Sequence, residues 1–420
     1  MRTWPLSEGS SANDSLRPAR RLDYFTVAGL TYLSAHPLFV LTSIPRLGLT
    51  IALVVICLIQ VVHRGAHIGA RPVLVSLLLS GLLILTPLLT GDPTTIPYLY
   101  YVSIVFLGLL FVHAVSLERF QAVFVRVMVV LSASSLALMV AVAISSTWVS
   151  FLPLQSGPFA DYRHAGIALF NLSRDPGTEG TIVGRNFGIA WEPGAFAVLI
   201  CLALAMLVFS QATNPGSPHR NLKISILVVA VLSTFSVTGY ACLAVVALSY
   251  IAQNAFSRSW IVIISTVIAF SYGVSRLGLT LFTSARTDYY LDGNIADRIS
   301  INRLGEILEA PWFPLGSGQT WVEVHAPGIW NSILVALLGL GLFFVLVLAV
   351  NLGRFALVFG KHAWVMALLL LIGASTELYF VTPLFMAFAM YGVAARSRVP
   401  MHCVKESKPK TRLTGSAPRQ

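Results

Sequence analysis

Charged residues are scarce in this 420-residue chain: Asp, Glu, Lys and Arg together make up only 11%. A soluble domain uses about 25% charged residues to cover its surface, so a water-facing shell is excluded. Hydrophobic residues reach 56% and the mean hydropathy is +0.79, which excludes a disordered or fibrous chain. The composition predicts an all-α, polytopic membrane protein, because backbone groups in lipid must be paired within helices.

Cysteine is also rare, and the four present show neither a disulfide framework nor a metal-ligand spacing. The chain has no Asp-x-Asp pair for a metal–diphosphate site, no Walker loop and no Gly-x-Ser-x-Gly elbow. Asp288 and Asp292 are too few ligands to indicate a metal by themselves. Nucleotide-powered chemistry is therefore not indicated, and we expect no metal and no cofactor.

Long apolar runs, by contrast, recur along the whole chain, and about 20 residues suffice to cross the hydrocarbon core. We place twelve spans on these runs, at 27–44, 46–62, 72–90, 97–116, 121–144, 193–210, 222–236, 239–254, 260–275, 329–350, 362–379 and 380–395. Two pairs are closely spaced, 222–236 with 239–254 and the last pair around Glu377 and Pro383. We expect the first of these to be a broken hairpin near the membrane surface.

Basic residues are distributed unevenly among the connections. If the N-terminus is cytoplasmic, the inner segments hold 20 of the 28 Lys and Arg residues and 5 of the 17 Asp and Glu residues. This asymmetry follows the positive-inside rule, so we expect both termini in the cytoplasm. Anionic lipid of the inner leaflet then accounts for the net charge of +11, and no nucleic-acid partner is expected.

This topology divides the chain into inner, spanning and outer segments. They are a cytoplasmic N-terminal segment (1–26), five spans (27–144), an outer loop (145–192), four spans (193–275), a large outer loop (276–328), three spans (329–395) and a basic cytoplasmic tail (396–420). Loops as long as the two outer ones are usually functional. Within the second outer loop, an apolar stripe and a capping Asn294 predict an interfacial helix over 294–309. Simple anchoring of this helix to the membrane surface is as good an interpretation as a functional site.

Three polar segments could carry chemistry. The first, 184–197, joins the first outer loop to a span and brings Arg185 and Glu192 to the start of a helix; a simple ion pair is the alternative. The second, 235–240, is a polar break or a plain hairpin turn. The third runs from Asp297 to Asn331 and contains His325, which could act as a base near neutral pH or could simply be solvated.

In this order, the three segments resemble the bacterial O-antigen polymerase and ligase superfamily. Arg185, Gly188, Glu192 and Pro193 match a loose Arg-x-x-Gly-x-x-x-Glu-Pro pattern of the Wzy-type polymerases. A Ser/Thr-rich break follows at 233–239. An outer-loop Arg, a Pro-Leu-Gly-x-Gly turn, a His and an Asn then precede a glycine-containing span, here Arg298, 314–318, His325, Asn331 and the region of 339–341.

The resemblance implies a membrane-embedded, metal-independent, inverting glycosyltransferase in the bacterial inner membrane. Its donor would be a glycan on undecaprenyl diphosphate, and its acceptor another lipid-linked repeat unit. Arg185 and Arg298 would bind the diphosphate with Arg303 or Arg286 as support, and His325 would be the base. Glu192 and Asn331 would bind substrate. A flippase and a chain-length regulator of the same pathway would be partners.

Two other classes of function stay open. A ligase of the same superfamily would differ only in its acceptor, which would be lipid A core or a protein. A flippase or another transporter of lipid-linked oligosaccharides also suits twelve spans, but it should place buried charges near mid-membrane, where this sequence has almost none. A scaffold subunit of a polysaccharide machine is a further possibility.

Overall fold

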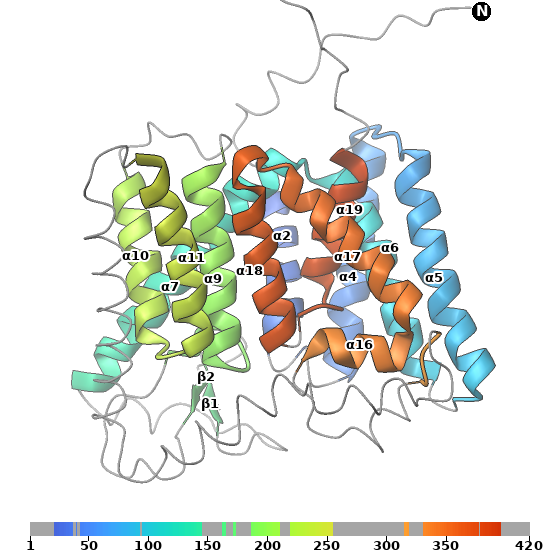
Figure 1. The fold of residues 1–420 in the computed structure, drawn as a ribbon, viewed down its shortest axis with the longest axis horizontal. Coiled ribbons are helices and arrows are strands. Elements are labelled where there is room, and N and C mark those ends of the chain that lie inside the picture. Colours follow the sequence, from blue (N-terminus) through green and yellow to red (C-terminus); the bar gives the residue numbers. More distant parts are fainter. Residues whose placement is uncertain are drawn as a thin grey trace, which may run out of the picture.

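The structure is a computed structural model of the chain. It describes residues 21–36, 39, 43–92, 95–144, 162–164, 171–173, 186–210, 219–254, 315–318, 331–377 and 379–395. These residues form an all-helical bundle with one small β-hairpin attached (Figure 1). The predicted span 260–275 and the predicted interfacial helix 294–309 lie outside this part of the chain, as does the tail 396–420.

The N-terminal half contributes upright helices joined by short connections. They are α2 (Arg21–Ala35), α4 (Ser43–His63), α5 (Ala70–Thr90), α6 (Thr95–Ala114) and α7 (Leu117–Ile144). All except α2 are long and apolar enough to cross a membrane over most of their length. The hairpin follows α7 and pairs β1 (Tyr162–His164) with β2 (Asn171–Ser173) in antiparallel fashion.

The C-terminal half contributes shorter apolar helices. They are α9 (Pro193–Phe209), α10 (Arg220–Ser233), α11 (Val237–Asn254), α16 (Ser332–Leu340), α17 (Leu342–Leu357), α18 (Ala363–Thr376) and α19 (Pro383–Ala395), with a short 3₁₀ turn η4 (Gly360–His362) before α18. Figure 1 shows α16 lying across one end of the bundle, whereas the other helices stand upright. The upright helices alternate in direction between the two ends of the bundle.

Two helices form the interior. In α9 every residue from Pro193 to Leu207 is buried, and α9 packs against α7, α10, α11 and α18. In α19 the residues from Pro383 to Val393 are buried, between α2, α5, α6 and α17. Helices that are apolar on all sides belong in the centre of a bundle. At Gly392 a side chain would collide with the backbone of α17, so this glycine allows the closest approach of α17 and α19.

The outer surface of the bundle is apolar. On α5, for example, Leu74 and Leu88 are 63% and 74% exposed, and exposed leucines, valines and isoleucines continue along α4 and α17. A soluble protein rarely exposes so much contiguous apolar surface. Together with the long apolar helices, this surface identifies a membrane protein.

The predicted spans agree with the helices in position but not always in extent. The break between the spans 222–236 and 239–254 is confirmed, because α10 ends at Ser233 and α11 begins at Val237. The predicted span 27–44 differs in extent, since α2 begins at Arg21 and ends at Ala35, and it buries Asp23 against basic partners. The single span 329–350 was wrong, because the chain breaks at Gly341, whose φ is +87°.

Candidate functional site

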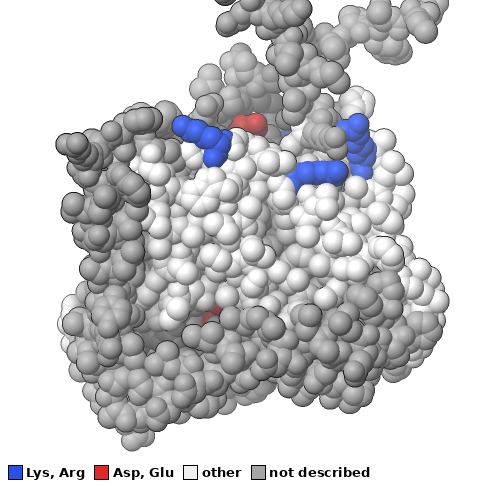
Figure 2. All heavy atoms as spheres, in the orientation of Figure 1, with Lys and Arg blue, Asp and Glu red and all other residues white. Residues whose placement is uncertain are grey.

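The two ends of the bundle differ in charge. At one end, which we call the basic end, Arg64 and Arg119 contact Asp23, and Arg220 donates to the carbonyl of Val208. The described residues of this end also include Arg21, Arg71, Arg126, Lys223, Arg354 and Lys361. Figure 2 shows the Lys and Arg side chains of the visible face along one rim. Among the described residues, the opposite end, which we call the polar end, has Arg46 and Arg163.

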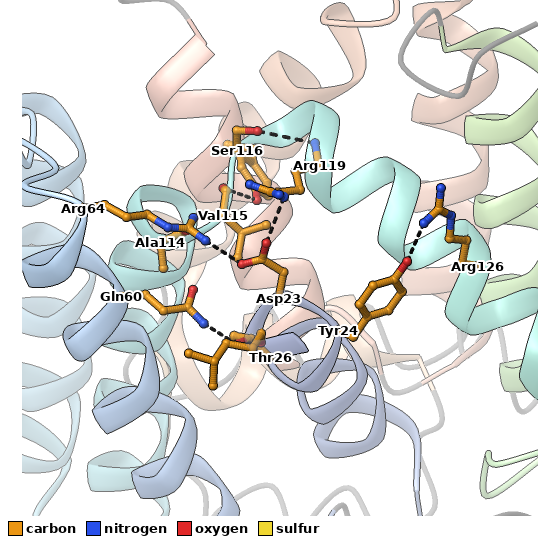
Figure 3. Close-up of polar contacts among 12 residues, drawn as sticks. Asp23, Tyr24, Thr26, Gln60, Arg64, Ala114, Val115, Ser116, Arg119 and Arg126 are labelled. Atoms are coloured by element: carbon orange, nitrogen blue, oxygen red, sulfur yellow. Dashed lines mark hydrogen bonds and ion pairs between the residues drawn. The ribbon is translucent and has the colours of Figure 1, made fainter. Parts of the chain in front are cut away.

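Asp23 is the centre of a buried ionic cluster at the basic end (Figure 3). Its carboxylate is fully buried and lies 2.7 Å from a guanidinium nitrogen of Arg64 and 2.8 Å from one of Arg119. Arg64 also donates to the carbonyl of Ala114. The cluster joins α2, α4 and α7 where the connection from α6 enters α7. Burial of the carboxylate is possible because two guanidinium groups offset its desolvation.

The first two predicted segments meet at the polar end. Asn186 donates its backbone N–H to the Ser233 carbonyl at 3.0 Å, and its side-chain amide donates to the hydroxyls of Ser233 at 2.9 Å and Ser135 at 3.1 Å. Its Oδ1 accepts from Gly188 N–H at 3.0 Å. Gly188 has a φ of +52° and leaves no room for a side chain beside the Phe196 ring. The turn before α9 is thus fastened to the break between α10 and α11.

Helix α9 starts at this junction. Glu192 is its half-buried N-cap residue, with extended backbone and no side-chain capping bond, and Pro193 fits the first turn. Gly239 of α11 lies so close that a Cβ there would be 2.6 Å from the Cβ of Ala197. The Ser236 hydroxyl is 3.2 Å from the position of a Cβ at Gly194. Both predicted segments therefore contribute to the start of α9.

Glu377, to which the sequence analysis gave no role, lies at the same point. It follows the last residue of α18, its side chain is buried, with the residue 1% exposed, and its Oε1 occupies the place that a Cβ at Gly194 would need. Its backbone carbonyl accepts from the Tyr379 N–H at 2.8 Å. The signal available in the sequence was an acid standing alone between two apolar runs, directly before the Pro383 break.

The third segment is connected through Ser332. Its hydroxyl oxygen lies 2.7 Å from the carbonyl oxygens of both Ala374 and Glu377, and it accepts the N–H of Phe380 at 3.0 Å. The preceding residue, Asn331, caps α16, because its Oδ1 accepts from the N–H groups of Ile333 and Leu334 at 3.1 and 3.2 Å. The start of α16 is thus tied to the break between α18 and α19.

Residues 315–318, the described part of the Pro-Leu-Gly-x-Gly motif, pack into the break between α16 and α17. Ser317 donates its N–H to the Leu338 carbonyl at 2.6 Å, and the Thr86 hydroxyl of α5 donates to the Leu315 carbonyl at 3.2 Å. A Cβ at Gly316 would lie 2.7 Å from the backbone of Gly339, and one at Gly341 would collide with Leu315. The stretch 315–318 of the third predicted segment and the glycine-containing region 339–341, which follows it in the resemblance, are therefore in direct backbone contact.

The end of α2 completes the polar end. Trp191 donates its backbone N–H to the Ala35 carbonyl at 3.2 Å, and Leu384 donates to the Ser34 hydroxyl at 2.8 Å. The Tyr379 hydroxyl donates to the Ala195 carbonyl at 2.8 Å, and the Trp191 and Tyr379 ring centroids are 5.1 Å apart. These contacts place Trp191, Glu192 and Glu377 around one helix start.

Of the predicted site residues, two are described. Glu192 is at the start of α9 and Asn331 at the start of α16, and the helix breaks next to them are joined through Glu377 and Ser332. Arg185, Arg286, Arg298, Arg303 and His325 lie outside the described residues, so their roles stay predictions. Within the described part of the chain, no group of three His, Cys, Asp or Glu side chains is placed to hold a metal ion.

Comparison of the chain with protein families, with characterised proteins and with solved structures gives no match. The function is therefore inferred from the chemistry and placement of the residues themselves.

Proposed function

We propose that the protein is a polymerase of a bacterial surface polysaccharide, an O-antigen or exopolysaccharide, which joins repeat units carried on undecaprenyl diphosphate. The observation that carries the proposal is the meeting of three sequence segments at the polar end. Asn186 contacts Ser233, and Gly194 lies beside Ser236. Glu377, against Gly194, has its carbonyl oxygen 2.7 Å from the hydroxyl of Ser332, the residue directly after the third segment. The same three segments carry the resemblance to the polymerase and ligase superfamily.

The proposed reaction is an inverting transfer at the anomeric carbon. A base takes the proton of the acceptor hydroxyl while its oxygen attacks C1 of the donor sugar. The new C–O bond forms as the bond from C1 to the diphosphate oxygen breaks, and undecaprenyl diphosphate leaves as the anion. Guanidinium groups can stabilise that anion through paired hydrogen bonds without a metal. In this scheme Arg185 and Arg298 bind the diphosphate, with support from Arg303 or Arg286, and His325 is the base.

Glu192 and Asn331 have more specific assignments within the scheme. Glu192 stands seven residues after Arg185 in the sequence and occupies the N-cap position of α9, from where its carboxylate would orient a guanidinium group or accept from a sugar hydroxyl. The Oδ1 of Asn331 is engaged in capping α16. Its role in substrate binding would therefore be carried by the side-chain NH₂ group.

The placement of buried acids favours an enzyme over the transporter alternative. A transporter holds its ions and substrate near the middle of the membrane, and ionisable side chains belong there. Among the described residues, the buried acids are Asp23, in the first turn of α2, and Glu377, directly after α18. Both lie at helix ends, which suits chemistry at the membrane surface.

The proposed orientation puts the basic end in the cytoplasm and the polar end in the periplasm, in the bacterial inner membrane. The described basic residues support it, since the basic end would then meet the anionic inner leaflet. The lipid-linked oligosaccharide would approach from the outer leaflet. A flippase would supply it, and a chain-length regulator would be a further partner.

Purified protein incubated with a single lipid-diphosphate-linked repeat unit tests the proposal. We expect a ladder of products that differ by one repeat, formed equally well with and without a chelator. A reaction that is lost with chelator and restored by a divalent ion would contradict the metal-independent mechanism, and absence of a ladder would contradict the polymerase. In a deletion strain, glycans of one repeat unit would support the polymerase, whereas full-length glycan left on the carrier lipid would indicate the ligase.

A further inference from the structure

The proposed reaction leaves one buried acid of the polar end without a role. The Glu377 side chain is buried, although burial of an acid in the interior of a membrane protein costs desolvation free energy that a neutral residue would not. Its position is also specific, because its Oε1 lies against the Cα of Gly194 where any other residue would place a Cβ. The Glu377 carboxyl group thus fits in this place only because residue 194, which is 183 positions away in the sequence, is a glycine.

The first turn of α9 is a favourable place for a carboxylate. The N-terminal turn of a helix carries a partial positive charge, which stabilises an anion within that turn. Gly194 is the second residue of α9, and its Cα–H groups allow an approach that a methyl group would block. The Glu377 carboxyl group therefore lies beside the first turn of α9, at the position of the missing Gly194 side chain.

Glu377 also connects the remaining segments. The Ser236 hydroxyl, from the break before α11, flanks Gly194 on the same side as the Glu377 carboxyl group. The Glu377 backbone carbonyl lies 2.7 Å from the Ser332 hydroxyl at the start of α16. Glu377 therefore lies against the first segment at Gly194, where Ser236 of the second segment is also close, and its backbone contacts Ser332, directly after the third.

We propose that Glu377 is a positioning residue of the proposed glycosyl transfer. Its carboxylate fixes the first turn of α9 and so the direction in which the adjoining Glu192 points into the site. Its backbone fixes the start of α16 next to Asn331. This inference rests on the proposed function, and it requires the negative charge of Glu377 rather than its volume alone.

The test compares Glu377→Gln with Glu377→Asp in the purified full-length protein, using the lipid-diphosphate repeat unit as substrate. Misplacement of catalytic groups by about 1 Å costs on the order of 100-fold in rate. We expect Glu377→Gln to lower kcat at least about tenfold with KM unchanged, and Glu377→Asp to recover part of that loss. The thermal midpoint should stay close to that of the wild type. Unchanged kcat in Glu377→Gln would overturn the inference, as would a lower thermal midpoint with normal kcat, which marks a merely structural role.

A second measurement needs no activity. Gly194→Ala should displace the Glu377 carboxyl group and lower the thermal midpoint. In the double variant Gly194→Ala/Glu377→Ala, the shorter side chain at 377 removes the collision, and part of the lost thermal midpoint should be restored. The matched control is Gly81→Ala in α5, which has nothing within 4 Å of the added methyl group and should show no coupling to Glu377→Ala. Additive effects of the Gly194 and Glu377 substitutions would overturn the contact on which the inference is built. If the wild type makes no ladder while this coupling is present, the proposed function fails and the contact stands.

Discussion

The two buried acids of the described chain show how surroundings decide what a residue does. Asp23 is held by two guanidinium groups within 2.8 Å, an arrangement that offsets its desolvation and ties three helices together. Glu377 lies instead against a helix start between segments that carry the proposed chemistry. We therefore expect loss of the Asp23 charge to affect folding, and loss of the Glu377 charge to affect rate.

Asp23→Asn should destabilise the protein, because it leaves Arg64 and Arg119 facing each other without the intervening anion. Removal of one partner from a buried ionic cluster costs about 3 kcal/mol. The measurement is the thermal midpoint of detergent-solubilised protein, together with the amount recovered from membranes. Glu118→Gln is the matched control, since Glu118 is exposed beside Arg119 and its change should be nearly neutral. An unaltered midpoint in Asp23→Asn would contradict the structural role of the cluster.

Arg298→Lys tests a predicted site residue that lies outside the described part of the chain. A lysine keeps the charge but provides a point charge in place of a planar fork, so paired contacts to a diphosphate are lost. We expect kcat to fall by about 100-fold in the ladder assay, the scale of removing one donor from a site that stabilises a developing anion. Arg276→Lys, in the same outer loop but without an assigned role, is the control. Full activity of Arg298→Lys would instead favour membrane anchoring.

At the scale of elements, the polar end is built from breaks in helices rather than from the helices themselves. Each break is visible in the backbone: Phe235 adopts a φ of +47° between α10 and α11, Gly341 a φ of +87° between α16 and α17, and Pro383 starts α19. Breaks free backbone groups, and in lipid these groups must find partners. The partners here come from other breaks, as in the pairs Asn186–Ser233 and Ser317–Leu338.

Gly341→Ala should separate two of these elements. A methyl group at this position collides with the backbone of Leu315, and the positive φ is strained for any residue but glycine. We expect a lower thermal midpoint, by an amount corresponding to about 2 kcal/mol, and loss of the ladder activity. Gly353→Ala in α17 meets nothing within 4 Å and should leave both unchanged or slightly raise stability. Equal behaviour of the two variants would show that the contact between 315–318 and 339–341 is dispensable.

The sequence predicts some of these breaks and misses others for a physical reason. The polar residues of 235–240 and the Pro383 step are local signals, and both mark real helix ends. The break at Gly341 was missed because its flanking residues are as apolar as any span. It is caused by the remote segment 315–318, and a remote contact leaves no trace in local hydropathy. Glu377 was given no role for the same reason, since its partner Gly194 is distant in sequence.

At the scale of the whole molecule, charge and chemistry are separated between two ends. Composition alone was enough to predict a helical membrane bundle, and the described helices with their apolar outer surface bear this out. Charge counting predicted that basic residues gather on one side, and the described arginines and lysines do so. Apolarity alone does not predict which helices are central. The central helix α19 is no more apolar than α6, which has lipid-facing residues, and the central helix α9 is no more apolar than α16, which lies across one end of the bundle.

The orientation of the two ends is the claim on which the proposed function depends most directly, and cysteine labelling measures it. Among the described residues Cys57, Cys201 and Cys242 are buried, and Cys403 can be changed to Ser. Single cysteines are then introduced as Gln319→Cys, directly after the turn 315–318 at the polar end, and as His67→Cys, exposed between α4 and α5 at the basic end. Intact spheroplasts are treated with a membrane-impermeant maleimide. We expect Gln319→Cys to be labelled at once and His67→Cys to be labelled only after lysis. The reverse pattern would place the polar end in the cytoplasm, away from any lipid-linked glycan of the outer leaflet, and would contradict the account.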